Sequence, residues 1–179
     1  MAGQQLAFGE QLGWISPKVV GDPENAAFLR QMARLRHRLR RFFYAGQMNR
    51  PPKLLGTIPT VTADWQWDGV TPVTTDAVLT GAWELPGPGA GGAPPERKLA
   101  LIFVNVSDQP VAARFTFDAA AFGLPADGLN MTTVTAGNES APEQCPGQFT
   151  RVLRFEPHKA WAWIITTPRA APGDSLKKK

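Results

Sequence analysis

An apolar segment followed directly by a basic helix, at the start of the sequence, most restricts what this chain can fold into. The segment Leu6–Ile15 is mainly apolar with one carboxylate, Glu10, and this pattern predicts a β-strand. A strand that leads into a helix is half of a βα unit, which cannot bury both faces without neighbouring strands. We therefore expect residues 1–53 to form the terminal βα element of a larger, barrel-like domain.

The helix has a start, an apolar face and an end that can be read from the sequence. Asp22-Pro23-Glu24 predicts a helix N-terminus near Pro23, because Asp caps free N–H groups and Pro suits the first turn. Gly46 and the break Arg50-Pro51-Pro52 predict its end. Apolar residues recur at helical spacing at Phe28, Met32, Leu35, Leu39 and Phe42. This apolar stripe needs a partner surface, which we expect from barrel strands outside this sequence.

From Ile58 onward the hydrophobic period changes to two, which is typical of strands separated by short turns. The segment 98–106 is almost entirely apolar, as expected for a central strand. We expect residues 54–168 to form an antiparallel β-sandwich that contains a Gly- and Pro-rich loop at 85–95. Residues 169–179 are expected to form a disordered tail. The seven candidate strands are Thr57–Gln66, Asp76–Glu84, Lys98–Val106, Val111–Asp118, Leu129–Thr135, Gln148–Phe155 and Lys159–Thr166. The predicted fold class is therefore mainly β, with one strand and one amphipathic α-helix before the sandwich.

Charge and cysteine content limit the partners and cofactors to consider. The net charge is +4, but three of those charges come from Lys177, Lys178 and Lys179 at the end of the chain. Six arginines crowd residues 30–41, where a phosphate-binding helix and the solvated face of a packed helix are alternatives, and we favour the packed helix. Cys145 is the single cysteine, which leaves no thiolate metal cluster or intramolecular disulfide, and we expect no metal or cofactor. No apolar run has the length of about 18 residues that a membrane span requires.

Carboxylates and tryptophans are the candidates for chemistry. Glycoside hydrolysis needs two carboxyl groups about 5 to 10 Å apart, and Glu10 is one candidate. No second partner is evident, since Glu84 lies in the other region and Asp64 and Asp68 flank a possible strand end, so catalytic residues stay unassigned. Trp14 suits stacking on a sugar ring or packing between strand and helix. A second tryptophan group, Trp65, Trp67 and Trp83, could form a sugar platform, but we favour core packing with Trp161 and Trp163.

Three segments carry a resemblance to a known kind of protein. Phe8–Trp14, the Arg-rich helix with Phe42-Phe43-Tyr44, and Leu101–Asp108 before a hairpin together resemble the C-terminal end of a bacterial glycoside-hydrolase-like protein of a poorly characterised family. Such proteins pair a (β/α)8 barrel with a C-terminal β-sandwich. The resemblance implies that Glu10, Gln11 and Trp14 bind substrate at the last barrel strand. It also implies carbohydrate, and the rest of the barrel or another subunit, as partners.

Three functions follow as hypotheses from different classes. The first is a C-terminal, non-catalytic portion of a glycoside-hydrolase-like protein, in which the sandwich buttresses the barrel and hydrolysis belongs to the parent. The second is a free-standing carbohydrate- or protein-binding β-sandwich with the helix docked on one face. The third, which we disfavour, is nucleic-acid binding through residues 30–41, because no helix-turn-helix, zinc-finger or RNA-recognition signature accompanies the arginines.

Overall fold

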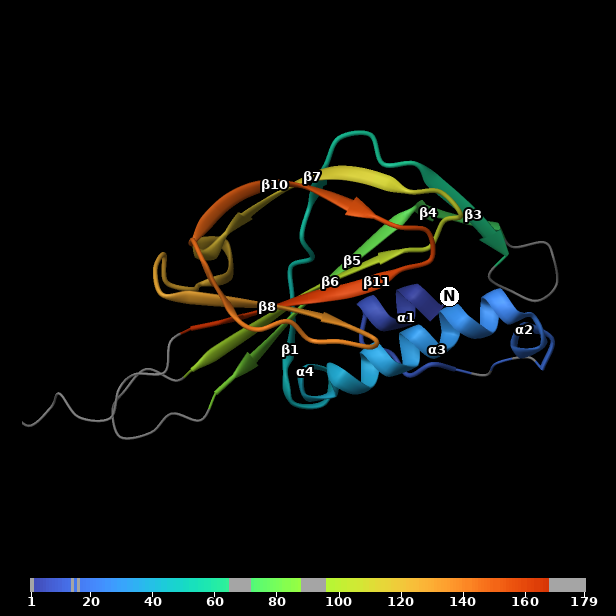
Figure 1. The fold of residues 1–179 in the computed structure, drawn as a ribbon, viewed down its shortest axis with the longest axis horizontal. Helices are drawn as coiled ribbons and strands as arrows, with labels where there is room; N and C mark the ends of the chain where they lie inside the picture. Colours follow the sequence, from blue (N-terminus) through green and yellow to red (C-terminus); the bar gives the residue numbers. More distant parts are fainter. Residues whose placement is uncertain (1, 14, 16, 65–71, 88–95, 168–179) are drawn as a thin grey trace, which may run out of the picture.

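The fold consists of two β-sheets packed face to face, with a layer of helices on the outer side of the larger sheet (Figure 1). The computed structural model describes residues 2–13, 15, 17–64, 72–87 and 96–167. Every strand pair in these ranges is antiparallel, which confirms the prediction of a mainly β, antiparallel sandwich. The predicted tail at 169–179 and most of the predicted loop at 85–95 lie outside the described ranges.

The larger sheet has six strands in the order β1-β5-β6-β11-β8-β9. Its two central strands come from distant parts of the sequence, because β11 pairs with β6 on one side and with β8 on the other. The strands in this sheet are β1 (Gln47–Asn49), β5 (Val78–Pro86), β6 (Arg97–Asn105), β8 (Leu129–Thr135), β9 (Glu143–Cys145) and β11 (Ala160–Thr166).

The smaller sheet has three strands and closes the sandwich from one side. It is formed by β2 (Leu54–Leu55), β7 (Val111–Asp118) and β10 (Gln148–Phe155), while β3 (Thr60–Asp64) and β4 (Pro72–Asp76) make a separate pair. A short 3-10 helix, η1 (Ala119–Phe122), follows β7. Strand β7 alternates buried and exposed residues along its whole length. Its buried Phe115 and Phe117 therefore face the larger sheet, where Trp163 packs 5.9 Å from Phe115 between ring centroids.

Strand β6 is buried on both of its faces, and this separates two cores. Leu99, Leu101 and Phe103 point into the sandwich core. The alternate residues Ala100, Ile102 and Val104 belong to a second core on the opposite face of the sheet. A strand without exposed positions explains the near-continuous apolar run in the sequence, because both sides of the sheet are covered.

The second core is covered by the helical layer. Its four helices are α1 (Ala2–Ala7), α2 (Pro17–Gly21), α3 (Pro23–Arg38) and α4 (Arg40–Ala45). The start of α3 is as predicted, since the Asp22 side chain accepts a hydrogen bond of 3.2 Å from the Asn25 N–H. Gly46 follows α4, as predicted for the end of the helical segment. Figure 1 shows α1 and α3 lying against the face of the large sheet that the smaller sheet leaves open.

The apolar stripe of the helical segment packs on the chain's own sheet. Met32, Leu35 and Leu39 are fully buried and Phe42 is 5% exposed, in one cluster with Ile102, Val104 and Ala162. The expectation that absent barrel strands must cover this stripe is therefore wrong. The physical reason is that β6 is apolar on both faces. The face of the sheet opposite the smaller sheet therefore needs an apolar cover, and the stripe on the helices supplies it.

The N-terminal strand expected at Leu6–Ile15 is also wrong. The structure has helix α1 up to Ala7, then a turn that ends at Gly9 with φ of 69°. Leu6 and Ala7 are fully buried, because the helix lies directly on the sheet at Gly81. A Cβ at position 81 would overlap the Ala7 carbonyl, so only glycine permits this close approach.

All seven predicted strand regions contain strands, at β3, β5, β6, β7, β8, β10 and β11. The strands β1, β2, β4 and β9, each of five residues or fewer, lie outside the predicted regions. Strand β1 pairs with β5, so residues of the first predicted region extend the sheet of the second. The division of the chain at residues 53 and 54 stays a prediction.

Replacing Leu35 by Ala tests the packing of the helical layer. We expect a loss of about 2–5 kcal/mol in the free energy of unfolding, because a fully buried Leu leaves a cavity in the second core. Urea denaturation measures this loss, and Leu55→Ala, at a position that is 37% exposed, is the matched control with a small effect. A loss from Leu35→Ala no larger than that of the control would contradict the packing of α3 on the sheet.

Candidate functional site

The residues predicted to bind substrate lie in the segment that follows α1. Glu10 and Gln11 are both exposed and sit outside regular structure, while Trp14 lies outside the described residues. Two hydrogen bonds fix the start of this segment: Arg36 Nη1 donates to the Gly9 carbonyl at 3.0 Å, and Trp83 Nε1 donates to the Ala7 carbonyl at 3.1 Å. The structure thus anchors the segment on α3 and β5 and presents both polar side chains to solvent.

An aromatic cluster packs against the start of this segment at Gly9. Trp83 meets Phe43 edge to face at 5.3 Å between ring centroids. The Arg36 guanidinium lies 5.0 Å from the centroid of Phe43 and 5.7 Å from that of Tyr44, which suits cation–π attraction. A shallow pocket of about 410 Å³ adjoins the cluster and is lined by Leu12, Ala33, Arg36, His37, Arg40 and Tyr44.

Among the described residues, the one carboxylate considered as a partner of Glu10 is bound elsewhere. Glu84 is committed to Arg97, whose Nε donates to Glu84 Oε1 at 2.7 Å, and Asn49 Nδ2 donates to its other oxygen at 3.3 Å. The same guanidinium also donates to the carbonyl of Gly123. This ion pair ties strands β5 and β6 to the turn after η1. Asp68 and the Asp64 side chain lie outside the described part of the chain.

The tryptophans that the structure describes pack in its two cores, but Trp83 does not share a core with Trp161 and Trp163, which corrects the favoured interpretation for that residue. Trp161 and Trp163 lie together on the sandwich side of β11, with ring centroids 5.1 Å apart. Trp83 lies on the opposite side of the sheet, where it packs with the helices. Trp65 and Trp67 fall outside the described residues, so a platform that includes them stays a prediction.

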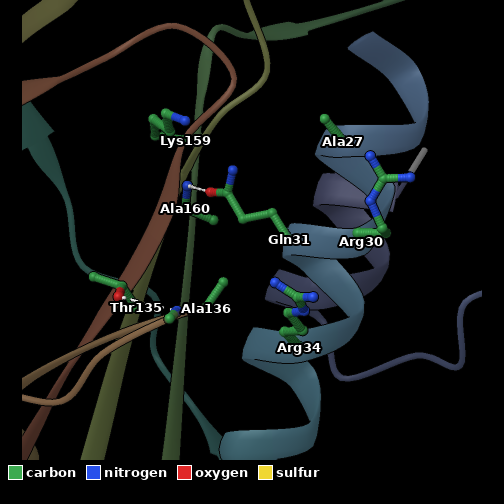
Figure 2. Close-up of a pocket in the computed structure, with 9 residues that line it drawn as sticks. Ala27, Arg30, Gln31, Arg34, Thr135, Ala136, Lys159 and Ala160 are labelled. Carbon is green, nitrogen blue, oxygen red and sulfur yellow. Dashed lines mark hydrogen bonds between the residues drawn. The ribbon is translucent and has the colours of Figure 1, made fainter. Parts of the chain in front are cut away.

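A second pocket, which sequence reasoning missed, lies between α3 and the strands β8 and β11 (Figure 2). Its volume is about 490 Å³. Gln31 connects the helix side to the strand side: its Oε1 accepts from the Ala160 N–H at 2.7 Å, and its Nε2 donates to the His158 carbonyl at 3.1 Å. Arg30 and Arg34 line the helix side and Lys159 the opposite side, with Thr135 and Ala136 lower in the view. Gly137 completes the lining. The arginine spacing was visible in the sequence, but no local signal links it to Lys159.

The histidines and the cysteine are the remaining candidates for chemistry. His158 Nε2 lies 2.9 Å from Asp108 Oδ1, and His37 is exposed on α3, so within the described ranges the two histidines are not a pair. Burial raises the pKa of the Cys145 thiol, with a smaller opposing effect of Arg151. Among the described residues, no group of three or more His, Cys, Asp or Glu side chains is arranged to hold a metal ion.

The fold and its pockets define an antiparallel β-sandwich with a helical layer and two concave, donor-lined surfaces. No family model and no curated protein matches the chain. One solved structure, titled a "putative alpha-N-acetylgalactosaminidase" from Bacillus halodurans C-125, is similar with a TM-score of 0.41 and 12% sequence identity. The likeness covers 94% of this chain and 31% of that one, so the chain spans about a third of its length. No helix in the described ranges is long and apolar enough to cross a membrane.

Gly9→Ala tests how the candidate segment is held. A Cβ at this position would come within 2.5 Å of Trp83 Cζ2, and the backbone has φ of 69°. We expect a loss of about 2 kcal/mol or more in the free energy of unfolding, from left-handed backbone strain and the clash with the ring.

The matched control is Gly21→Ala, because nothing lies within 4 Å of a Cβ there. This variant should be neutral or gain up to about 1 kcal/mol. Thermal and urea unfolding measure both variants, and equal stability of the two would refute the described packing of Gly9 on Trp83.

Proposed function

We propose that this chain is a non-catalytic β-sandwich portion of a glycoside-hydrolase-like, carbohydrate-active protein. The sequence resemblance supports this class, and the lining of the two pockets supports a binding or supporting role. Arg, Lys, Gln and His side chains line them, and neither lining set contains Asp or Glu. Such donors bind sugar hydroxyls or anionic groups, whereas bond cleavage by a glycosidase uses a carboxyl pair. This donor lining is the observation that carries the proposal.

The segment after α1 is the part of the proposal closest to a substrate. Glu10 and Gln11 are exposed at the edge of the aromatic cluster, where a carboxylate and an amide supply acceptors and a donor for sugar hydroxyls. We propose that they and Trp14 contact carbohydrate when a catalytic barrel stands beside them. Exposed apolar side chains near this segment, Phe8 at 40%, Tyr44 at 72% and Met48 at 47%, supply a surface for that barrel.

The proposal predicts a division of activity between this chain and the protein that contains it. The product of the complete genomic reading frame should bind or cleave at least one member of a broad glycan panel. Residues 1–179 alone should cleave none, because hydrolysis is assigned to the barrel. Reducing-sugar release and a glycan array measure the two activities.

Two results would refute this division. Cleavage by residues 1–179 alone would contradict the non-catalytic role. A complete product that neither binds nor cleaves any glycan would contradict the carbohydrate-active class itself.

A second candidate function is a free-standing carbohydrate- or protein-binding module. The specific observation in its favour is the full burial of Met32, Leu35 and Leu39 against the chain's own sheet. A helix covered in this way has no unpaired apolar stripe and so no need of a further domain for stability. The supporting role and the free-standing role therefore differ in what the isolated chain does in solution.

Unfolding and size of the isolated chain separate the two candidates. A free-standing module is expected to be monomeric and to unfold in one cooperative transition, because both cores share the central sheet. Size-exclusion chromatography with light scattering and differential scanning calorimetry measure these properties. Self-association through the surface around Phe8 and Tyr44, abolished by Tyr44→Ser, would favour the supporting role instead.

A further inference from the structure

We propose that the pocket between α3 and the strands β8 and β11 binds an oxyanion group, a sulfate, phosphate or carboxylate, carried by a sugar-sized ligand. The site lies on the other side of α3 from Glu10 and Gln11. Nothing in the proposed supporting role requires it, and its test is independent of the glycan panel. Figure 2 shows the residues that line it.

The first argument is charge. Arg30 and Arg34 are four residues apart on α3 and line the same pocket as Lys159. Like charges at this helical spacing repel each other by a few tenths of a kcal/mol, and a bound anion would relieve the repulsion. Among the described residues, no carboxylate forms an ion pair with any of the three cations. The next arginine along this face, Arg38, differs because it has Glu139 at 3.8 Å.

The second argument is that the side chain of Gln31, which lines the pocket, is held in place before any ligand binds. Gln31 is held by two hydrogen bonds, one to the first residue of β11 and one to the turn before it, so the helix side and the strand side of the pocket are tied together. Its amide nitrogen has two donor hydrogens, and only one bond from that nitrogen is used. The second hydrogen is available to an oxygen of a ligand. Arginine supplies a planar pair of donors that matches the oxygens of sulfate, phosphate or carboxylate.

The third argument is size. The volume of about 490 Å³ lies within the range of small-ligand pockets and can hold a sugar together with its charged group. A nucleic-acid backbone would instead need a basic face that continues along the helix. The ion pair of Arg38 with Glu139 places a carboxylate at the next turn of α3, where the following phosphate would have to lie. The geometry thus favours one compact anion over a polyanionic strand.

Binding measurements on residues 1–179 test the site. Isothermal titration calorimetry at low salt should detect glucose 6-sulfate, glucose 6-phosphate or glucuronate, with uncharged glucose as the reference. At least one of these anions should bind about tenfold or more tightly than glucose, and more tightly than inorganic sulfate or phosphate. Arg34→Gln and Arg30→Gln should each weaken that binding by about tenfold, the value of one charge-assisted hydrogen bond.

The matched control is Arg154→Gln on β10, which removes the same charge from an exposed position of the smaller sheet. Its affinity should equal that of the unmodified chain. Circular dichroism without ligand should show the same melting temperature for all three variants, because the three positions are exposed.

Three outcomes would overturn the proposal. One is no binding of any anionic sugar by the unmodified chain. Another is an equal loss of affinity in Arg154→Gln and Arg34→Gln, which would mean general charge attraction. The third is tighter binding of a 20-nucleotide single strand than of any anionic sugar, with steep salt dependence, which would assign the arginines to a nucleic-acid backbone.

Discussion

Burial of the central sheet on both faces is the constraint on which the rest of this structure depends. Strands β6 and β11 lie in the middle of the six-stranded sheet, and their side chains contribute to two separate cores. A sheet with two apolar faces is stable only between two covers. The smaller sheet covers one face and the helices cover the other, so the fold requires the helical layer for its stability. Removing it would expose Ala100, Ile102 and Val104 to water.

The close fit of the helical layer also explains where concave surfaces occur. Helix α1 approaches the sheet closely at Gly81, and α3 presses Met32, Leu35 and Leu39 into the same core. A concave surface lies on each flank of α3, and one of them lies against β8 and β11. One hollow carries aromatic and apolar groups with Arg36, and the other carries cations with Gln31. Both candidate surfaces thus follow from the requirement to cover one sheet face.

Much of the sandwich could be predicted from the sequence, because alternation and turn residues are local signals. The alternating burial of β7 and the shared face of Trp161 and Trp163 are direct expressions of the two-residue strand period. The Asp22 cap on α3 is equally local. The prediction of a strand at Leu6–Ile15 was wrong because a short apolar run fits a strand or a buried helix equally well. The contact of Ala7 with Gly81 is tertiary and is not visible in the local sequence. The basic pocket also escaped, since Gln31 and Lys159 come together only through tertiary packing.

A helix that must bury one face has an opposite face on which substitutions cost the fold little. On α3 the buried face holds Met32 and Leu35, while Arg30 and Arg34 lie on the exposed side and touch neither core. Their charge is therefore not explained by stability, and repulsion between them slightly opposes it. Gln31 stands at the boundary, since its backbone contacts tie α3 to β11 and also form the wall of the pocket. The same side chain thus fixes the helical cover and shapes the surface where a ligand would bind.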